Sequence, residues 1–442
     1  MRRTKFTKFL VAVAAAVVVS SSAWGQETLH LTLDDALKVA LSENVSVKVA
    51  DMEVTRTEYA QKGTYASLFP QIDFTGSYQR AIKKQKMFMM DMEIVIGRNN
   101  TYTMGFNAAL PLVNVELWKA IQITGMDVEL AVEKAKGSKV DLIDQVNQAF
   151  YGVLLAKDLY NVYKENYDNA KDNYDDVKAK FDTGIASKFE FLSAEVAMQN
   201  AEPNVYDAQN SIMLANWKLK ALLGIDLNQN IECVGSLSDF EKTVADVASF
   251  ESLSIENNST VKQLEIQERM LDKTYEMKLA KYYPTLAGQI SYNWMAMEEN
   301  FKFSDYKLNP YSTGVLALTI PIFSGGKRYN DLRQTKIQQE QLALQKEDAI
   351  RNIEIGVMQV VSSLETSLKQ YQAAQKTIEG AQAGYEIAKK MYDVGSGTLL
   401  ELQEAQLGLL QAKLNLNQSV FTYMTLKSSL DKLLGVNQVM NK

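Results

Sequence analysis

The sequence predicts a mainly α-helical protein with a small β part, built as two tandem structural repeats. Each repeat is expected to run helix, strand, strand, long helix and return helix. Three observations predict this fold class: the chain is self-similar at an offset near 211 residues, apolar positions keep helical spacing over unusually long stretches, and short runs alternate polar with apolar residues.

The internal repeat is clearest near the expected helix ends. Phe181-Asp182-Thr183-Gly184 is matched by Tyr392-Asp393-Val394-Gly395 at an offset of 211 residues. Leu222-Leu223-Gly224-Ile225 is matched by Leu433-Leu434-Gly435-Val436 at the same offset. The chain therefore divides into a first repeat, a linker and a second repeat, at residues 26–224, 225–250 and 251–442.

Long helices follow from an unbroken apolar pattern. From Leu142 to Phe181, and again from Ile353 to Tyr392, apolar or small residues recur at alternating spacings of four and three. This spacing is typical of helices that pack side by side over many turns. It predicts a long helix and a return helix in each repeat, at about 114–182 and 188–224, and at about 327–394 and 398–435. Shorter helices are expected to lead into the strands, at 33–66 and 251–281.

Four short runs alternate in the manner of β-strands, at about 71–80, 101–110, 285–294 and 311–320. Each has roughly the ten-residue length of a tilted membrane strand, and aromatic residues lie near the run ends, among them Tyr78, Tyr102 and Trp294. Alternation alone also fits two half-buried soluble hairpins. Four strands cannot close a barrel, and open edges are not tolerated in lipid. Three chains would supply twelve strands around an open lumen, so we expect a homotrimer with a shared transmembrane β-barrel.

The first 25 residues have the pattern of a signal peptide. A basic segment that contains Arg2, Arg3, Lys5 and Lys8 precedes a short apolar run, and Ala23-Trp24-Gly25 has the small-x-small pattern of a cleavage site. We expect the mature chain to begin near Gln26.

Composition excludes several classes of function. Loss of the four basic residues takes the net charge from −6 to about −10, which argues against nucleic acid as a partner. The single cysteine, Cys233, excludes an intramolecular disulfide framework. The single histidine, His30, would have to serve any His-dependent nucleophilic site or any His-based metal site, and such sites usually need further partners. We therefore expect no enzyme activity, no cofactor and no bound metal.

Several motifs resemble those of the TolC-like outer-membrane efflux protein family. The run Leu318-Thr319-Ile320-Pro321-Ile322-Phe323-Ser324-Gly325-Gly326 is similar to the family's strand-to-helix signature. Leu41-Ser42-Glu43-Asn44 and Leu68-Phe69-Pro70-Gln71-Ile72 are similar to its opening, and 181–195 and 392–406 to its periplasmic tips. The resemblance implies a homotrimer in the outer membrane of a Gram-negative-type bacterium. It also implies a helical tunnel in the periplasm that docks onto a periplasmic adaptor and an inner-membrane pump.

The resemblance also suggests where function lies. The two inter-helix turns would be adaptor-docking tips, at Thr183, Gly184 and Ile185, and at Val394, Gly395 and Ser396. The alternative is plain turn chemistry, for which glycine is common. Glu401 and Glu404 match the family's acidic selectivity positions, and Glu190 is added to them as the repeat partner of Glu401, although a solvated helix face would look the same. Gly397 stands where TolC itself has a gating arginine, so that charge contact is not expected.

The sequence does not determine which cargo the protein exports. We expect small-molecule export of a drug, toxic compound or metal, with polypeptide secretion as the alternative within the family. A trimeric surface adhesin is the alternative from another class, but its strands would be expected at the C-terminus, whereas here they are internal and duplicated. Methionines in the inter-strand loops could bind a soft metal, although adaptable apolar packing explains them as well.

Overall fold

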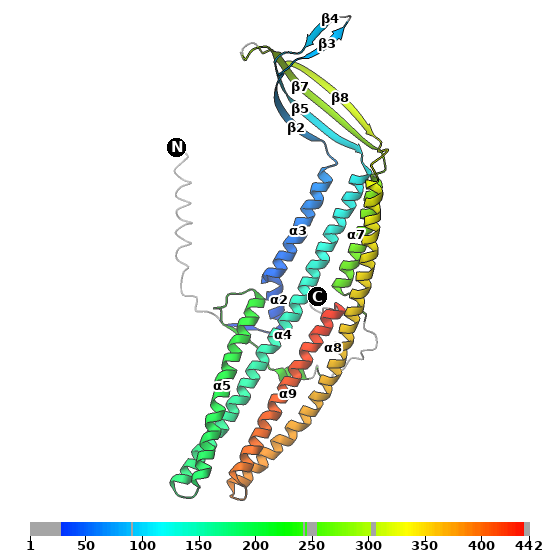
Figure 1. The fold of residues 1–442 in the computed structure, drawn as a ribbon. Helices are drawn as coiled ribbons and strands as arrows, with labels where there is room; N and C mark the ends of the chain where they lie inside the picture. Colours follow the sequence, from blue (N-terminus) through cyan, green and yellow to red (C-terminus); the bar gives the residue numbers. More distant parts are fainter. Residues whose placement is uncertain (1–27, 90–91, 242–243, 245–253, 302–305, 437–442) are drawn as a thin grey trace, which may run out of the picture. The chain divides into compact units, whose positions relative to one another are not determined.

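A computed structural model describes residues 28–89, 92–241, 244, 254–301 and 306–436. The expected signal peptide at 1–25 lies outside these residues. The chain forms two compact units, each assembled from separate segments. Unit 1 is made of residues 1–48, 137–258 and 353–442, and unit 2 of residues 49–136 and 259–352. Two long helices, α4 (Val115–Asp182) and α8 (Lys327–Asp393), run through both units (Figure 1).

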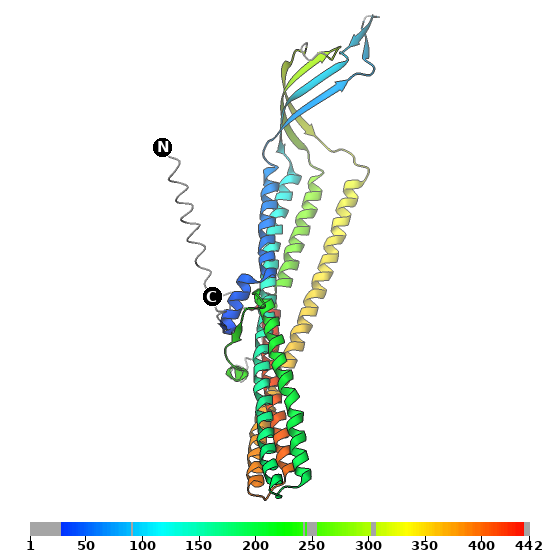
Figure 2. The same ribbon diagram turned by 90° about the vertical axis from the view of Figure 1, so that its left-hand side faces the viewer.

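Unit 2 contains a four-stranded antiparallel sheet and the helices that lead into and out of it (Figure 2). The strands are β2 (Gln71–Arg80), β5 (Asn100–Val113), β7 (Thr285–Glu298) and β8 (Asn309–Thr319). They pair in the order β2-β5-β7-β8, so β2 and β8 are the edge strands. The shorter helices of this unit are α3 (Val45–Ala66) and α7 (Ser259–Ala280).

The strand register gives this sheet two faces of opposite character, because successive side chains point to opposite sides. On the face that we call the apolar face, Phe74 and Phe106 pack across β2 and β5 with 5.0 Å between ring centroids, and Tyr292 and Trp294 pack along β7 at 4.8 Å. The remaining apolar-face residues include Ile72, Tyr78, Tyr102, Met104, Ile290, Leu316 and Leu318. The opposite, polar face carries Gln71, Asp73, Thr75, Ser77, Thr103, Asn107, Gln289, Ser291, Asn293 and Thr313.

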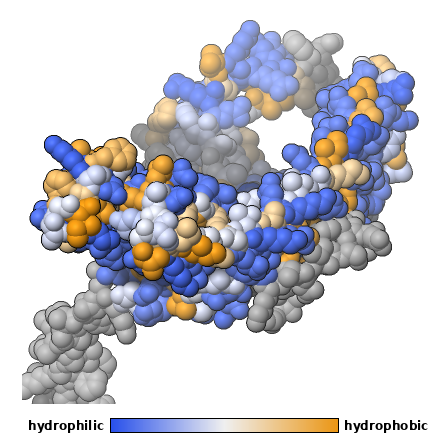
Figure 3. Space-filling view, turned by 90° about the horizontal axis from the view of Figure 1, so that it is seen from below, coloured by the Kyte–Doolittle hydropathy of each residue, from blue (hydrophilic) through white to orange (hydrophobic). Residues whose placement is uncertain are grey.

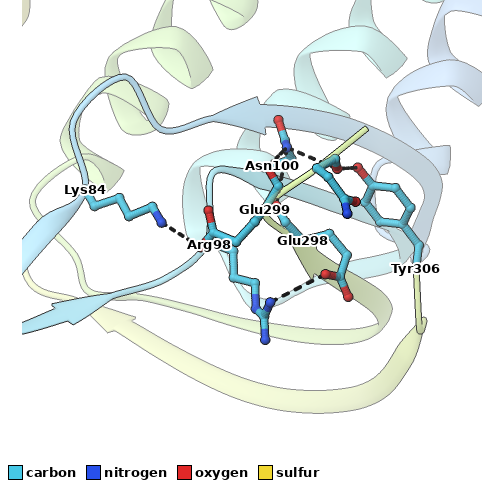
Figure 4. Close-up of polar contacts among 7 residues, drawn as sticks. Lys84, Arg98, Asn100, Glu298, Glu299 and Tyr306 are labelled. Atoms are coloured by element: carbon cyan, nitrogen blue, oxygen red, sulfur yellow. Dashed lines mark hydrogen bonds and ion pairs between the residues drawn. The ribbon is translucent and has the colours of Figure 1, made fainter. Parts of the chain in front are cut away.

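The segment between β2 and β5 is more ordered than the loop predicted from the sequence. It forms a second antiparallel hairpin, from β3 (Gln85–Met89) and β4 (Met92–Ile96). Polar contacts connect the base of this hairpin to the last residue of β7 and to the residue after it (Figure 4). Lys84 Nζ lies 2.6 Å from Glu299 Oε1, and Arg98 Nη1 lies 3.5 Å from Glu298 Oε2.

Asn100, at the start of β5, completes this network. Its side chain is almost fully buried, and its Nδ2 lies within hydrogen-bond distance of the backbone carbonyls of Glu298, Glu299 and Asn300. Tyr78 donates its hydroxyl hydrogen to Asn100 Oδ1 at 2.8 Å. Because a buried amide left without partners would be costly, Asn100 pins the ends of β2, β5 and β7 together.

Unit 1 contains the main hydrophobic core. It includes α2 (Leu33–Glu43), α5 (Lys188–Leu223), α9 (Leu399–Leu434), a short 3₁₀ helix η1 (Leu237–Phe240), and the C-terminal parts of α4 and α8. A parallel pair of short strands, β1 (Leu29–Leu31) and β6 (Ile231–Cys233), joins the segment before α2 to the predicted linker at 225–250. The core residues come from all these elements, among them Leu31, Leu37, Val146, Phe150, Val153, Leu154, Leu219, Leu223, Leu237, Val420 and Tyr423.

The same junction occurs once in each repeat, where the end of a return helix meets Asn44 or Asn258, the residue that directly precedes α3 or α7 in the chain. Asn44 Nδ2 donates to the carbonyl of Leu222 at 2.8 Å, and Asn258 Nδ2 donates to the carbonyl of Leu433 at 2.8 Å. Each return helix then ends on a glycine in the left-handed conformation, Gly224 with φ 71° and Gly435 with φ 66°. The asparagine amides satisfy carbonyls that the helix ends leave without an intrahelical partner.

These junctions explain the corrections to the predicted helices. The helix predicted over 33–66 breaks at Asn44 into α2 and α3, because Asn44 has extended backbone angles there. The helix predicted from 251 begins at Ser259, directly after Asn258, and residues 254–258 are not helical.

Other predicted boundaries shift by a few residues. The start of α5 at Lys188 is as predicted, whereas Thr398 is an N-cap rather than a helical residue. Gly224 and Gly435 are C-caps, and α8 ends at Asp393 rather than 394. Asn114 precedes α4 and its Oδ1 accepts from the Leu117 N–H. Strands β5 and β7 are longer than predicted, and β8 covers 309–319 in place of 311–320.

Pro203 lies inside α5, which stays helical from Lys188 to Leu223. Among the described residues, no helix combines the length and apolar character needed to cross a membrane.

The junction geometry predicts unequal costs for two matched glycine substitutions. Gly224 and Gly395 have similar positive φ values of 71° and 76°, so alanine at either position pays about 1 kcal/mol or slightly more for the left-handed backbone. A Cβ at Gly224 would also lie 2.7 Å from the carbonyl oxygen of Glu43, whereas a Cβ at Gly395 meets nothing within 4 Å. In circular-dichroism melts of the purified protein, Gly224→Ala should therefore lower the unfolding temperature clearly more than Gly395→Ala. Equal shifts would contradict close packing at this junction.

Candidate functional site

The two predicted docking turns lie in unit 1 and have the same backbone geometry. At the α4–α5 turn, the N–H groups of Gly184 and Ile185 donate to the carbonyls of Phe181 and Lys180 at 2.9 and 2.8 Å. At the α8–α9 turn, the N–H groups of Gly395 and Ser396 donate to Tyr392 and Met391 at 3.0 and 2.9 Å. Gly184 and Gly395 both have positive φ, as this type of helix ending requires.

Apolar side chains project from both turns. Ile185 and Val394 are each 78% exposed, a high value for branched aliphatic residues. Phe189 and Leu400, the second residues of the return helices, are also strongly exposed and were not singled out from the sequence. The view of this end of the molecule has separate apolar patches among hydrophilic residues (Figure 3). Exposed apolar residues with polar surroundings are typical of protein interaction sites.

Beneath the turns, packed side chains connect the two helix pairs. Val177, Ala194 and Leu399 form a small buried cluster, and Phe181 stacks on Phe191 with 5.0 Å between ring centroids. Lys180 Nζ lies 4.8 Å from the centre of the Tyr392 ring. A hydrogen bond to Asp176 raises the pKa of Lys180. The structure therefore brings the two predicted tips together.

The three predicted selectivity carboxylates do not have equivalent surroundings. Glu190 Oε2 accepts the Ser187 backbone N–H at 2.7 Å, and Glu401 Oε2 accepts the Thr398 backbone N–H at 2.7 Å. The caps reciprocate, because the Ser187 and Thr398 hydroxyls accept the backbone N–H groups of these glutamates. Both glutamates therefore complete capping boxes at the starts of α5 and α9.

These hydrogen bonds also determine the charge state of the two glutamates. The backbone N–H of Ser187 lowers the pKa of Glu190, and the backbone N–H of Thr398 lowers the pKa of Glu401. Both effects follow from hydrogen bonding to the charged form. Glu404 lies one turn beyond Glu401 on α9 and is exposed, and it has no part in either cap. Glu404 was not separated from Glu401 on the sequence, although the spacing from Thr398 to Glu401 is that of a capping box and is a signal that could have done so.

Gly397 has a structural explanation as well. A Cβ there would lie 3.0 Å from Met391 Cβ and 3.2 Å from the Tyr392 backbone nitrogen. A larger residue would therefore push against the end of α8. Within the described residues, no group of three or more His, Cys, Asp or Glu residues is arranged to hold a metal ion.

The family model described as outer membrane efflux protein matches residues 36–225 and, a second time, residues 252–436. The chain belongs to this family. ArpC of Pseudomonas putida, an antibiotic efflux pump outer membrane protein, is 20% identical over 430 residues, which cover 96% of this chain and 86% of ArpC. AprF of Pseudomonas aeruginosa, an alkaline protease secretion protein, is 20% identical over 339 residues, 76% of this chain and 70% of AprF. The crystal structure of CusC has the same fold, with a TM-score of 0.76 at 18% identity, covering 95% of this chain and 96% of CusC.

Family membership settles the class of protein. The chain is an outer membrane channel protein of tripartite efflux or secretion systems of Gram-negative bacteria, and the family is not enzymatic. The mainly helical fold with two repeats is confirmed, since the family model matches each repeat once. The surface-adhesin alternative has no support from these matches.

The unequal roles of Glu401 and Glu404 predict a difference in local stability. Glu401→Ala should remove the capping box and increase amide exchange in the first turn of α9, whereas Glu404→Ala, the matched control, should leave it unchanged. Acidification should act like Glu401→Ala. A lowered pKa means that the stabilisation is complete above the ordinary glutamate value of 4.5 and is lost as the pH falls through the lowered value. Protection factors for this turn, measured by hydrogen exchange over a pH series, would check this, and a larger effect of Glu404→Ala would contradict it.

Proposed function

We propose that this chain is the outer-membrane exit duct of a tripartite efflux system, acting as a homotrimer. Three copies of the sheet would close a twelve-stranded barrel in outer-membrane lipid, and the helices of three chains would form a tunnel in the periplasm. The observation that carries the proposal is the two-faced sheet with free edges. Its apolar, aromatic face suits lipid, and its polar face suits a water-filled lumen.

The edges of the sheet supply the reason for oligomerisation. Within the described residues, β2 and β8 each have one hydrogen-bonded neighbour. An unpaired strand edge in a bilayer leaves backbone groups without water or protein partners, which costs several kcal/mol for each group. Pairing of β8 with β2 of the next copy would satisfy these groups. Three chains give enough strands for an open lumen, whereas two would give a barrel filled by its own side chains.

The tips are the proposed contact with a periplasmic adaptor that links the duct to an inner-membrane pump. Ile185 and Val394 present apolar surface at equivalent positions of two similar turns. In a trimer this pair would be repeated three times around the end of the tunnel. The proposed docking residues are the three of each turn, Thr183, Gly184 and Ile185 with Val394, Gly395 and Ser396.

Glu404 is the strongest candidate for ion selection at this end. Its carboxylate is exposed and is not used in a cap, so three copies would place a ring of uncommitted negative charge near the tunnel entrance. Glu190 and Glu401 would add negative charge, but their hydrogen bonds to backbone N–H groups hold them in place.

The proposed cargo is a small molecule, that is, a drug, a toxic compound or a metal. The similarity to ArpC, whose name describes antibiotic efflux, covers 96% of this chain and supports that cargo. Polypeptide secretion is the second candidate. The similarity to AprF, a protease secretion protein, supports it and covers 76% of this chain.

A photo-crosslinker at Ile185 or Val394 should capture a periplasmic adaptor in native membranes, because both side chains project from the proposed docking turns. Tyr206, which is 62% exposed on α5 away from the turns, is the matched control and should capture no adaptor. Mass spectrometry of the product identifies the partner. An adaptor of a proton-driven pump would support small-molecule efflux, and an adaptor of an ATP-driven exporter would support polypeptide secretion. A well-expressed trimer that captures no adaptor from either turn would refute the docking assignment.

A further inference from the structure

The polar face of the four-stranded sheet carries a single ionisable residue. Register places the odd-numbered residues of β2 and their partners on this face. Among the described residues of β2, β5, β7 and β8, Asp73 is the only Asp, Glu, Lys or Arg on it. The charged residues on the apolar face, Arg80 and Glu298, lie at the end beside the β3–β4 hairpin. Asp73 is instead the third residue of β2, close to α3.

The neighbours of Asp73 leave its carboxylate facing solvent. Its row across the sheet runs through Asn107, Ser291 and Thr313. Ser291 and Thr313 share a hydrogen bond of 2.7 Å, and Asn107 Nδ2 donates to Thr75 Oγ1 at 3.1 Å. These polar groups are thus engaged with one another, and Asp73 is exposed. No cationic side chain shares its face of the sheet to neutralise it.

We propose that Asp73 is a charge-selecting position of the channel, where carboxylates from three copies form a ring inside the strand region that favours cations. This inference rests on the proposed function, because the polar face lines a lumen only when the sheets of three chains complete one barrel. Threefold symmetry brings the three carboxylates to one level. Low-dielectric walls strengthen their combined field, so the local concentration of cations rises and that of anions falls.

Screening gives the proposal a distinctive signature. The field of an exposed charge extends about 10 Å at 0.1 M salt and about 3 Å at 1 M. Selection by the Asp73 ring is therefore strong at low salt and fades at high salt. A residue with a merely structural role in β2 would not produce this dependence.

The test measures reversal potentials of the full-length protein in planar bilayers under a KCl gradient, at low and at high salt. All variants are compared in a Glu404→Gln background, so that charge at the tip does not dominate the measurement. Asp73→Asn is expected to keep conductance but to move the reversal potential towards zero at low salt. Asp73→Lys is expected to move it past zero, towards anion preference. Gln71→Asn, on the same strand and face, is the control and leaves the potential unchanged.

A rescue variant separates charge selection from a structural effect. Asn107 lies directly opposite Asp73 in the β2–β5 register, so Asp73→Asn combined with Asn107→Asp moves the carboxylate to the adjacent strand within the same row. The double variant is expected to recover the cation preference. Unchanged selectivity in Asp73→Asn, with normal conductance, would overturn the role of Asp73 and leave the duct assignment intact. Absence of any conductance from the parent trimer would overturn both.

Discussion

The hydrogen bond from an asparagine amide to the end of a return helix is the constraint on which the fold of each repeat depends. Asn44 and Asn258 donate this hydrogen bond at equivalent positions. In each case the side-chain Nδ2 lies 2.8 Å from a backbone carbonyl oxygen near the end of α5 or α9. The last carbonyls of a helix have no partner within the helix, so a buried helix end needs such a donor. Both asparagines are only 7% exposed, and losing a buried partner costs about 1–3 kcal/mol. The glycines that follow the return helices let the backbones approach closely enough for the bond to form.

The sheet creates a second requirement, which a single chain does not meet. Its two faces differ in polarity and its two outer strands have one neighbour each. Exposed edges and an exposed aromatic face are unfavourable for an isolated chain in water, and edges are unfavourable in lipid too. The proposed closure with further copies in a membrane would satisfy both demands. The lone carboxylate on the polar face would then be repeated by symmetry as a ring, which one chain cannot form.

The tips divide their residues between structure and interaction. Glycine at the turn and the capping boxes of Glu190 and Glu401 start and end the helices cleanly, with hydrogen bonds that also keep these carboxylates ionised. Ile185 and Val394 have few contacts and are available to a partner. Glu404, one turn further along α9, is the carboxylate not involved in a cap. A turn that is stable without its partner can present a pre-organised surface, which reduces the entropy cost of docking.

The sequence by itself determined the repeat, the lengths of the long helices and the positions of the four main strands. These features depend on local periodicity, which is read within a window of the chain. The tertiary structure alone decided the break at Asn44 and the late start of α7 at Ser259, because the partner carbonyls are more than a hundred residues away. It also decided the parallel pairing of β1 with β6, whose three-residue strands are too short to have a pattern of their own. The distinction between Glu401 and Glu404 depends on both. The spacing from Thr398 to Glu401 is that of a capping box and can be read from the sequence. Only the tertiary structure shows that the Glu401 carboxylate accepts the Thr398 backbone N–H, because that contact depends on how the chain turns at this point.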